Sequence, residues 1–153
     1  MTSGVAATLQ AALRRRGETV GCAESLTGGQ LAAVLTSAPG ASETFVGGVV
    51  SYASRVKRDL LGVAAERVVS AECAVEMAVG ARSLLGVDWA LSTTGVAGPD
   101  RQEGQDVGTV YVGVAGARGA HATKLLLDGD RAAIRNAACM AAVDLLLVEL
   151  TDG

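Results

Sequence analysis

A serine in the segment AESLTGG, residues 23–29, is the first place where the sequence can do chemistry. The segment lies between an expected strand and an expected helix, and its glycines let a ligand approach backbone N–H groups closely. Such a turn can hold a phosphate. It can also expose Ser25 as a nucleophile and stabilise the oxyanion of an acyl-transfer intermediate with the amides of the helix start. The simpler alternative is that Ser25 or Thr27 only caps the helix.

A serine hydroxyl is a poor nucleophile at neutral pH unless a base accepts its proton. The single histidine, His121, falls on a late expected strand, whereas Tyr52 and Lys57 lie across a strand-to-helix turn. Lys57 is therefore the better base candidate, provided that burial or neighbouring cations lower its pKa. The Tyr52 hydroxyl could relay the proton. Alternatively, Lys57 is a surface residue of an amphipathic helix and Tyr52 packs in the core.

Two further segments offer groups that can bind a ligand. Residues 93–100, TTGVAGPD, follow an expected strand, and α/β proteins commonly bind ligands beyond strand ends. The small residues there leave an open floor, and Thr94 could donate a hydrogen bond. Arg131 and Arg135 lie one turn apart at the start of the last expected helix, where they could clamp a phosphate. A tight turn and ordinary solvated helix charges are the alternatives.

The hydropathy pattern predicts the elements that must position these residues. Helices are expected over residues 1–16, 30–36, 55–61, 71–85 and 130–150, and strands over residues 18–23, 44–52, 88–92, 107–114 and 121–127. Ser70 and Asp130 are expected helix N-caps. The last two strands are joined by a glycine-containing turn and should form an antiparallel hairpin. This order predicts a three-layer α/β/α sandwich with a mixed sheet, as a single domain over residues 1–153.

The composition excludes several classes of protein. The chain has 153 residues and a formal net charge of −3, which argues against a nucleic-acid partner. No apolar run reaches the roughly 18–20 residues that span a membrane. A single histidine excludes a histidine-rich metal site.

The cysteines and the alanine content bear on compartment and assembly. The three cysteines, Cys22, Cys73 and Cys139, are widely spaced, and no signal peptide is visible. This pattern predicts buried structural thiols in a reducing cytoplasm. The alanine-rich, apolar composition of so small a chain predicts that some of its surface is buried in a homo-oligomer.

Four motifs in order resemble the CinA C-terminal domain family: AESLTGG, GGVVSYASRVKRDLLGV, TTGVAGP and GDRAAIR. The resemblance runs from about residue 17 to about residue 147. The family includes free-standing bacterial nicotinamide-nucleotide amidases, and the chain looks like that stand-alone form because no partner domain precedes the first motif. The resemblance implies deamidation of nicotinamide mononucleotide to nicotinate mononucleotide and ammonia in pyridine-nucleotide salvage, with no cofactor and no required metal.

The resemblance also implies roles for individual residues. Ser25 corresponds to the nucleophile, Lys57 to its base, and Tyr52 to a hydroxyl that relays the proton or positions the substrate. Residues expected to contact the nucleotide are Glu24, Thr27, Gly28, Gly29, Thr94, Gly95, Ala97, Gly98, Arg131 and Arg135.

Residues 100–106, DRQEGQD, depart from the family pattern. The resemblance implies a glycine-rich stretch that ends in Lys-Pro, whereas this stretch is charged and keeps one glycine. Leu26 stands where cysteine is frequent. The altered loop leaves two alternatives open. The chain could bind a nucleotide as a regulatory module without turnover, or it could hydrolyse another small amide.

Overall fold

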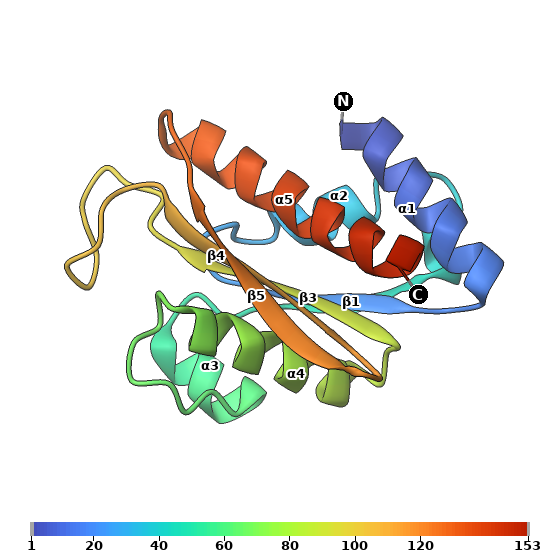
Figure 1. Cartoon of the computed structure of the whole chain (residues 1–153), viewed down its shortest axis with the longest axis horizontal. Helices are drawn as coiled ribbons and strands as arrows, with labels where there is room; N and C mark the ends of the chain where they lie inside the picture. The colour runs from blue at the N-terminus through green and yellow to red at the C-terminus, as the bar shows by residue number, and fades with distance from the viewer. Residues whose placement is uncertain (1, 153) are drawn as a thin grey trace.

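A mixed five-stranded sheet runs through the middle of the structure, a computed structural model that describes residues 2–152 (Figure 1). The strands are β1 (Val20–Glu24), β2 (Phe45–Val50), β3 (Trp89–Gly95), β4 (Thr109–Gly116) and β5 (Gly119–Leu126). Their order across the sheet is β2-β1-β3-β4-β5. β1 pairs in parallel with β2 and β3, whereas the β3–β4 and β4–β5 pairs are antiparallel. The predicted mixed sheet and terminal hairpin are confirmed.

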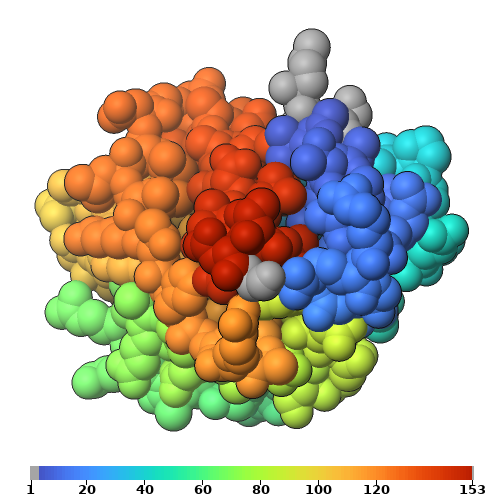
Figure 2. All heavy atoms as spheres, turned by 45° about the vertical axis from the view of Figure 1, so that its right-hand side comes forward, coloured from blue at the N-terminus to red at the C-terminus, as the bar shows by residue number. Residues whose placement is uncertain are grey.

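Helices cover both faces of the sheet and complete the predicted three layers (Figure 1). One face carries α1 (Thr2–Arg16), α2 (Gln30–Leu35) and α5 (Arg131–Asp152), and the other carries α3 (Ser54–Leu61) and α4 (Ala71–Leu85). A short 3-10 turn, η1 (Ala41–Glu43), precedes β2. Figure 2 shows the last turns of α5 beside α1. Within residues 2–152, no helix is both long enough and apolar enough to cross a membrane.

The helix ends follow the signals in the sequence. The Ser70 hydroxyl accepts a hydrogen bond from the Cys73 N–H (3.0 Å), and Asp130 Oδ1 accepts one from the Ala133 N–H (2.9 Å). Both predicted N-caps are therefore confirmed. α3 ends at Gly62, whose φ of 71° favours a residue without a Cβ atom.

β1 and β3 continue past their expected carboxyl ends, and both extensions matter for the site. β1 reaches Glu24, so Ser25 follows the strand directly. β3 runs to Gly95 instead of ending at residue 92, because β4 pairs with it as far as Val110 opposite Gly95. Thr93 and Thr94 are therefore buried strand residues rather than part of an open turn.

Small residues allow the layers to approach closely. A Cβ atom on Gly80 of α4 would lie 2.1 Å from the Leu61 carbonyl oxygen of α3, so no larger residue fits without moving a backbone. The absence of a side chain at residue 80 therefore lets α3 and α4 pack in close contact. All three cysteines are free and buried, as predicted.

Candidate active site

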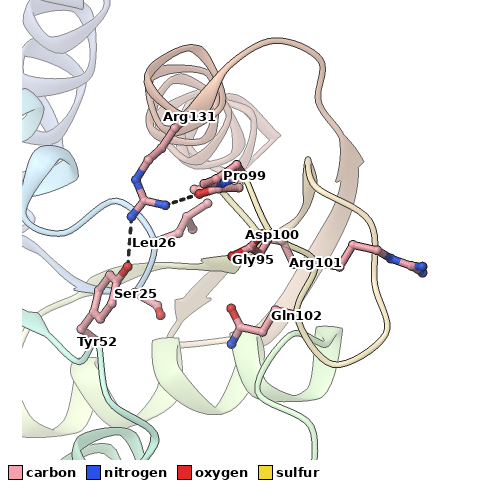
Figure 3. Close-up of a pocket in the computed structure, with 12 residues that line it drawn as sticks. Ser25, Leu26, Tyr52, Gly95, Pro99, Asp100, Arg101, Gln102 and Arg131 are labelled. Carbon is pink, nitrogen blue, oxygen red and sulfur yellow. Dashed lines mark hydrogen bonds between the residues drawn. The ribbon is translucent and has the colours of Figure 1, made fainter.

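A pocket of about 380 Å³ opens where β1, β2 and β3 end. Because these strands are parallel, their carboxyl ends meet at one edge of the sheet, the usual place for a ligand in such folds. Ser25 and Leu26 line the pocket after β1, Tyr52 lines it after β2, and residues 95–102 line it from the last residue of β3 onward. Arg131 borders it from the start of α5 (Figure 3). Its volume lies within the range of small-molecule sites.

Ser25 and Lys57 are in direct contact at this edge. Lys57 Nζ lies 2.9 Å from Ser25 Oγ, and the Lys57 side chain is 1% exposed. Nζ also donates hydrogen bonds to the carbonyl oxygens of Ser51 (2.7 Å) and Tyr52 (3.1 Å). The Ser51 N–H and hydroxyl both donate to the Glu24 carbonyl oxygen, which ties the end of β2 to the end of β1. Ser25 therefore lies at the pocket surface, and the Lys57 amine lies buried beneath it.

The surroundings of Lys57 favour the neutral amine. Burial, the largest cause, lowers the pKa of Lys57 from its ordinary value. Cys73 and Glu103 raise that pKa in part, and Arg58 lowers it. A neutral amine has two N–H bonds, which the two carbonyl oxygens can accept, and one lone pair. That lone pair is then available to the Ser25 hydroxyl proton.

Tyr52 lies on the wall of the pocket rather than between Ser25 and Lys57. Its side chain is 60% exposed, and its hydroxyl accepts a hydrogen bond from Arg131 Nη2 (3.1 Å). Arg131 also donates to the Gly98 carbonyl oxygen (Figure 3). Because Lys57 reaches Ser25 directly, this geometry provides a proton path that does not need the Tyr52 hydroxyl.

Glu24 is fully buried beneath the Ser25 turn, although it was expected to contact the nucleotide. Its Oε1 accepts hydrogen bonds from the Thr27 hydroxyl (2.6 Å) and from the N–H groups of Gly29 (3.2 Å) and Leu31 (2.8 Å). Oε2 accepts from the Ala32 N–H (2.9 Å). The carboxylate thus takes up the free amides of α2, where negative charge is favourable. Those amides were expected to bind an oxyanion, and here they are already occupied.

Two amides that follow the serine have no hydrogen-bond partner in the part of the chain that the structure describes. Among the described residues, neither the Leu26 N–H nor the Thr27 N–H donates a hydrogen bond to a protein atom. Leu26 lines the pocket, whereas Thr27 is fully buried, with its hydroxyl 2.8 Å from that of Thr93. The Leu26 N–H is therefore the better oxyanion donor. The sequence could not single it out, because only the fold shows which amides Glu24 occupies.

The other expected binding residues divide into two groups. Gly95, Ala97 and Gly98 line the pocket, as does Arg131. Arg135 is not among the lining residues and instead stabilises the turn that carries Ser25. Its Nε donates to the Leu26 carbonyl oxygen (3.0 Å), and its Nη2 donates to the Thr27 carbonyl oxygen (3.1 Å).

Thr94, Gly28 and Gly29 shape the backbone around the pocket. Thr94 is buried, and its hydroxyl donates to the Val68 carbonyl oxygen (2.6 Å). Gly28 and Gly29 take φ values of 57° and 108°, which turn the chain into α2. Within residues 2–152, no three His, Cys, Asp or Glu side chains cluster as metal ligands.

Replacing Glu24 by glutamine should destabilise the fold. The new side-chain amide would turn an NH₂ group towards N–H donors, and the charge that strengthens the remaining bonds would be lost. We expect the free energy of unfolding to fall by about 2–4 kcal/mol. Urea denaturation followed by circular dichroism measures it. Glu43→Gln, at an exposed glutamate 3.7 Å from Arg14, is the control and should change stability by less than about 1 kcal/mol. Equal effects of the two changes would contradict the assigned role.

Comparison with known proteins shows which sequence family the chain resembles. A model of the CinA C-terminal domain matches residues 2–150. A CinA-like protein of Frankia casuarinae is 50% identical over 139 residues, covering 88% of this chain and 32% of that protein. A CinA-like protein of Synechocystis is 47% identical over 133 residues, covering 83% of this chain and 32% of that protein. The chain therefore spans about a third of the length of these curated relatives.

Solved structures of similar length agree with this grouping. A CinA superfamily protein from Klebsiella pneumoniae superposes with a TM-score of 0.96 at 31% identity, covering 100% of this chain and 99% of that chain. One from Escherichia coli superposes with a TM-score of 0.92 at 27% identity, covering 96% of this chain and 89% of that chain.

Proposed function

We propose that this chain, which belongs to the CinA C-terminal domain family, hydrolyses the carboxamide of nicotinamide mononucleotide to give nicotinate mononucleotide and ammonia. The names of the relatives specify no reaction. The proposal is carried by one observation, the contact of 2.9 Å between Ser25 Oγ at the pocket surface and the buried Lys57 Nζ. A serine paired with a neutral base is the arrangement that acyl transfer needs.

The mechanism follows from that contact. Neutral Lys57 accepts the Ser25 proton while Oγ attacks the carboxamide carbon, and the Leu26 N–H donates to the oxyanion. The Lys57 ammonium then returns the proton to the departing nitrogen, the C–N bond breaks, and ammonia leaves. Lys57 next accepts a proton from water, which attacks the acyl carbon. The bond between that carbon and Oγ then breaks, and the Lys57 ammonium returns the proton to Oγ. The products are the carboxylic acid and free Ser25.

Ammonia release from nicotinamide mononucleotide tests the proposal directly. Purified wild type should release ammonia, and EDTA should leave the rate unchanged, because no step requires a metal. Nicotinate mononucleotide, which lacks the amide nitrogen, is the negative control. Saturable binding of nicotinamide mononucleotide without ammonia release would instead favour a regulatory module. If the protein neither binds nicotinamide mononucleotide nor releases ammonia from it, the proposed substrate is wrong. That result would support another small amide as the substrate, since the altered residues 100–102 line the pocket.

Arg131→Ala should weaken binding of the nucleotide. A guanidinium at the rim of the pocket suits a phosphate, and losing charge-assisted hydrogen bonds to it should raise KM about 10- to 100-fold. Arg118→Ala, in the turn between β4 and β5, is the matched control and should leave KM unchanged. Nicotinamide riboside lacks the phosphate, so its KM should not respond to Arg131→Ala. Equal increases for both substrates would contradict phosphate recognition by Arg131.

The rate should rise with pH through the pKa of Lys57. Only the neutral amine accepts the serine proton, and its fraction grows as pH increases, so kcat/KM should climb and then level off. Because burial lowers that pKa, the midpoint should lie below the ordinary lysine value. Measuring kcat/KM from about pH 6 to about pH 10.5 checks this, the upper end being near the unperturbed pKa. A flat profile over that range would argue against Lys57 as the base.

A further inference from the structure

The carboxylate of Glu103 attaches the altered loop of residues 100–106 to a neighbouring segment. Glu103 Oε1 accepts a hydrogen bond from the Val69 N–H (2.8 Å), and Oε2 accepts one from the Val68 N–H (3.0 Å). Gln105 Nε2 donates to the Val69 carbonyl oxygen (2.7 Å). These bonds join the loop to the 63–70 segment, which connects α3 and α4.

The backbone at Glu103 is unusual. Its φ is 51°, and it is the only non-glycine residue within residues 2–152 in the left-handed region. Residues with a Cβ atom enter that region at an energetic cost, which is why glycine is normal there. Two charge-assisted hydrogen bonds from one carboxylate offset that cost. The conformation and the side-chain contacts therefore act together to fix the loop.

We propose that Glu103 is a positioning residue of the substrate pocket, which holds residues 100–102 as a fixed wall and so helps to select the amide that fits. The three residues before it, Asp100, Arg101 and Gln102, all line the pocket that contains Ser25, and the Gln102 side chain extends into it (Figure 3). The inference rests on the proposed amidase function, which by itself assigns Glu103 no part.

Glu103 also acts on Lys57 through its charge. The charged and titratable groups that act on Lys57 are Arg58 on α3, Cys73 on α4 and Glu103 on the loop. Glu103 raises the pKa of Lys57, because a carboxylate favours the ammonium form. Removing the Glu103 charge should therefore lower the pKa of Lys57 further. This gives a readout that a merely structural residue would not move.

Glu76 on α4 provides a matched control. Its Oε1 accepts hydrogen bonds from the N–H groups of Ala64 (3.1 Å) and Ala65 (2.8 Å), in the same 63–70 segment. Like the Glu103 contact, this one joins a carboxylate to two backbone N–H groups, but it uses a single oxygen and does not involve the pocket loop. Glu76 is also absent from the charges that shift Lys57. Glu76→Gln thus removes a carboxylate charge from the same segment without the effect on the pocket, while its amide oxygen can still accept both bonds.

The test compares Glu103→Gln, Glu103→Asp and Glu76→Gln with wild type. KM is measured by ammonia release from nicotinamide mononucleotide, and the pH midpoint of Ser25 acylation by p-nitrophenyl acetate. Glu103→Gln should raise KM about tenfold, the effect of weakening one charge-assisted bond, and should move the midpoint to lower pH. Glu103→Asp keeps the negative charge but has a shorter side chain. It should therefore raise KM and leave the pH midpoint of acylation unchanged. Glu76→Gln should change neither quantity.

The outcomes separate this inference from the proposed function. If wild type releases no ammonia from the nucleotide, the proposed substrate is wrong, and the ester midpoint decides the inference. Equal midpoints in Glu103→Gln and Glu76→Gln would then overturn it. If ammonia is released but Glu103→Gln and Glu76→Gln share one KM, the inference is wrong and the amidase function stands. Should Glu103→Gln fail to fold, an unchanged KM in Glu103→Asp would overturn it.

Discussion

Ser25→Ala is expected to lower ammonia release from nicotinamide mononucleotide by at least about a thousandfold while leaving nucleotide binding intact. The substitution removes only the Oγ atom that attacks the carboxamide. The Leu26 N–H and the pocket wall stay in place, so Kd measured by calorimetry should remain within about threefold of wild type, a difference below about 0.7 kcal/mol. The expected pattern is therefore a loss of kcat without a loss of affinity.

The control for this change is another serine that the mechanism does not use. Ser83 lies exposed on α4, and Ser83→Ala should retain the wild-type rate. Mass spectrometry of wild type quenched during turnover should detect an acyl adduct that the Ser25→Ala protein lacks. An undiminished rate in Ser25→Ala would remove the serine from the mechanism.

Lys57→Met is expected to cost about two to four orders of magnitude in kcat/KM, the usual contribution of a general base. Methionine has a similar length and suits a buried site, so the variant should fold. Removal of a desolvated amine stabilises the protein, whereas the carbonyl oxygens of Ser51 and Tyr52 lose a donor. Because the two effects oppose each other, we expect the free energy of unfolding to change by less than about 2 kcal/mol.

The chain contains one other lysine, Lys124 on β5, which makes the control simple. Its Nζ lies 6.0 Å from the centre of the Tyr111 ring, and the mechanism gives it no role. Lys124→Met should keep the rate. The remaining activity of Lys57→Met should also lose the pH dependence expected of wild type. Retention of more than about a tenth of the wild-type rate would rule out Lys57 as the main base.

The sequence was sufficient for most of the fold because local signals and tertiary packing agree. Ser70 and Asp130 cap their helices as predicted, and alternating helices and strands indicated the layers. The pairing of Ser25 with Lys57 follows from one further fact, that β1 and β2 are parallel neighbours whose ends lie together. The order of the strands could not be predicted, since hydropathy does not say which strands pair.

The binding residues were harder to predict, because a polar residue beside a pocket can contact either a ligand or the protein's own backbone. Glu24 and Arg135 are charged, and both use their charge on the backbone of the serine turn and the helix that follows it. Thr94 lies on β3, whose extra length depends on pairing with β4, so its side chain faces residue 68. Residue type alone does not distinguish a group that binds ligand from one that satisfies buried amides and carbonyls.

The contact between Ser25 and Lys57 also joins two layers of the molecule. Ser25 leads into α2 on one face of the sheet, and Lys57 belongs to α3 on the other (Figure 1). Sliding of one helical layer against the other would separate the two atoms without deforming either layer. Because a shift of about 1 Å can cost a hundredfold in rate, such shear would act as an off state. The close approach of Gly80 to Leu61 fixes α3 on α4 within one layer, so such a shear would carry Lys57 with both helices as a unit.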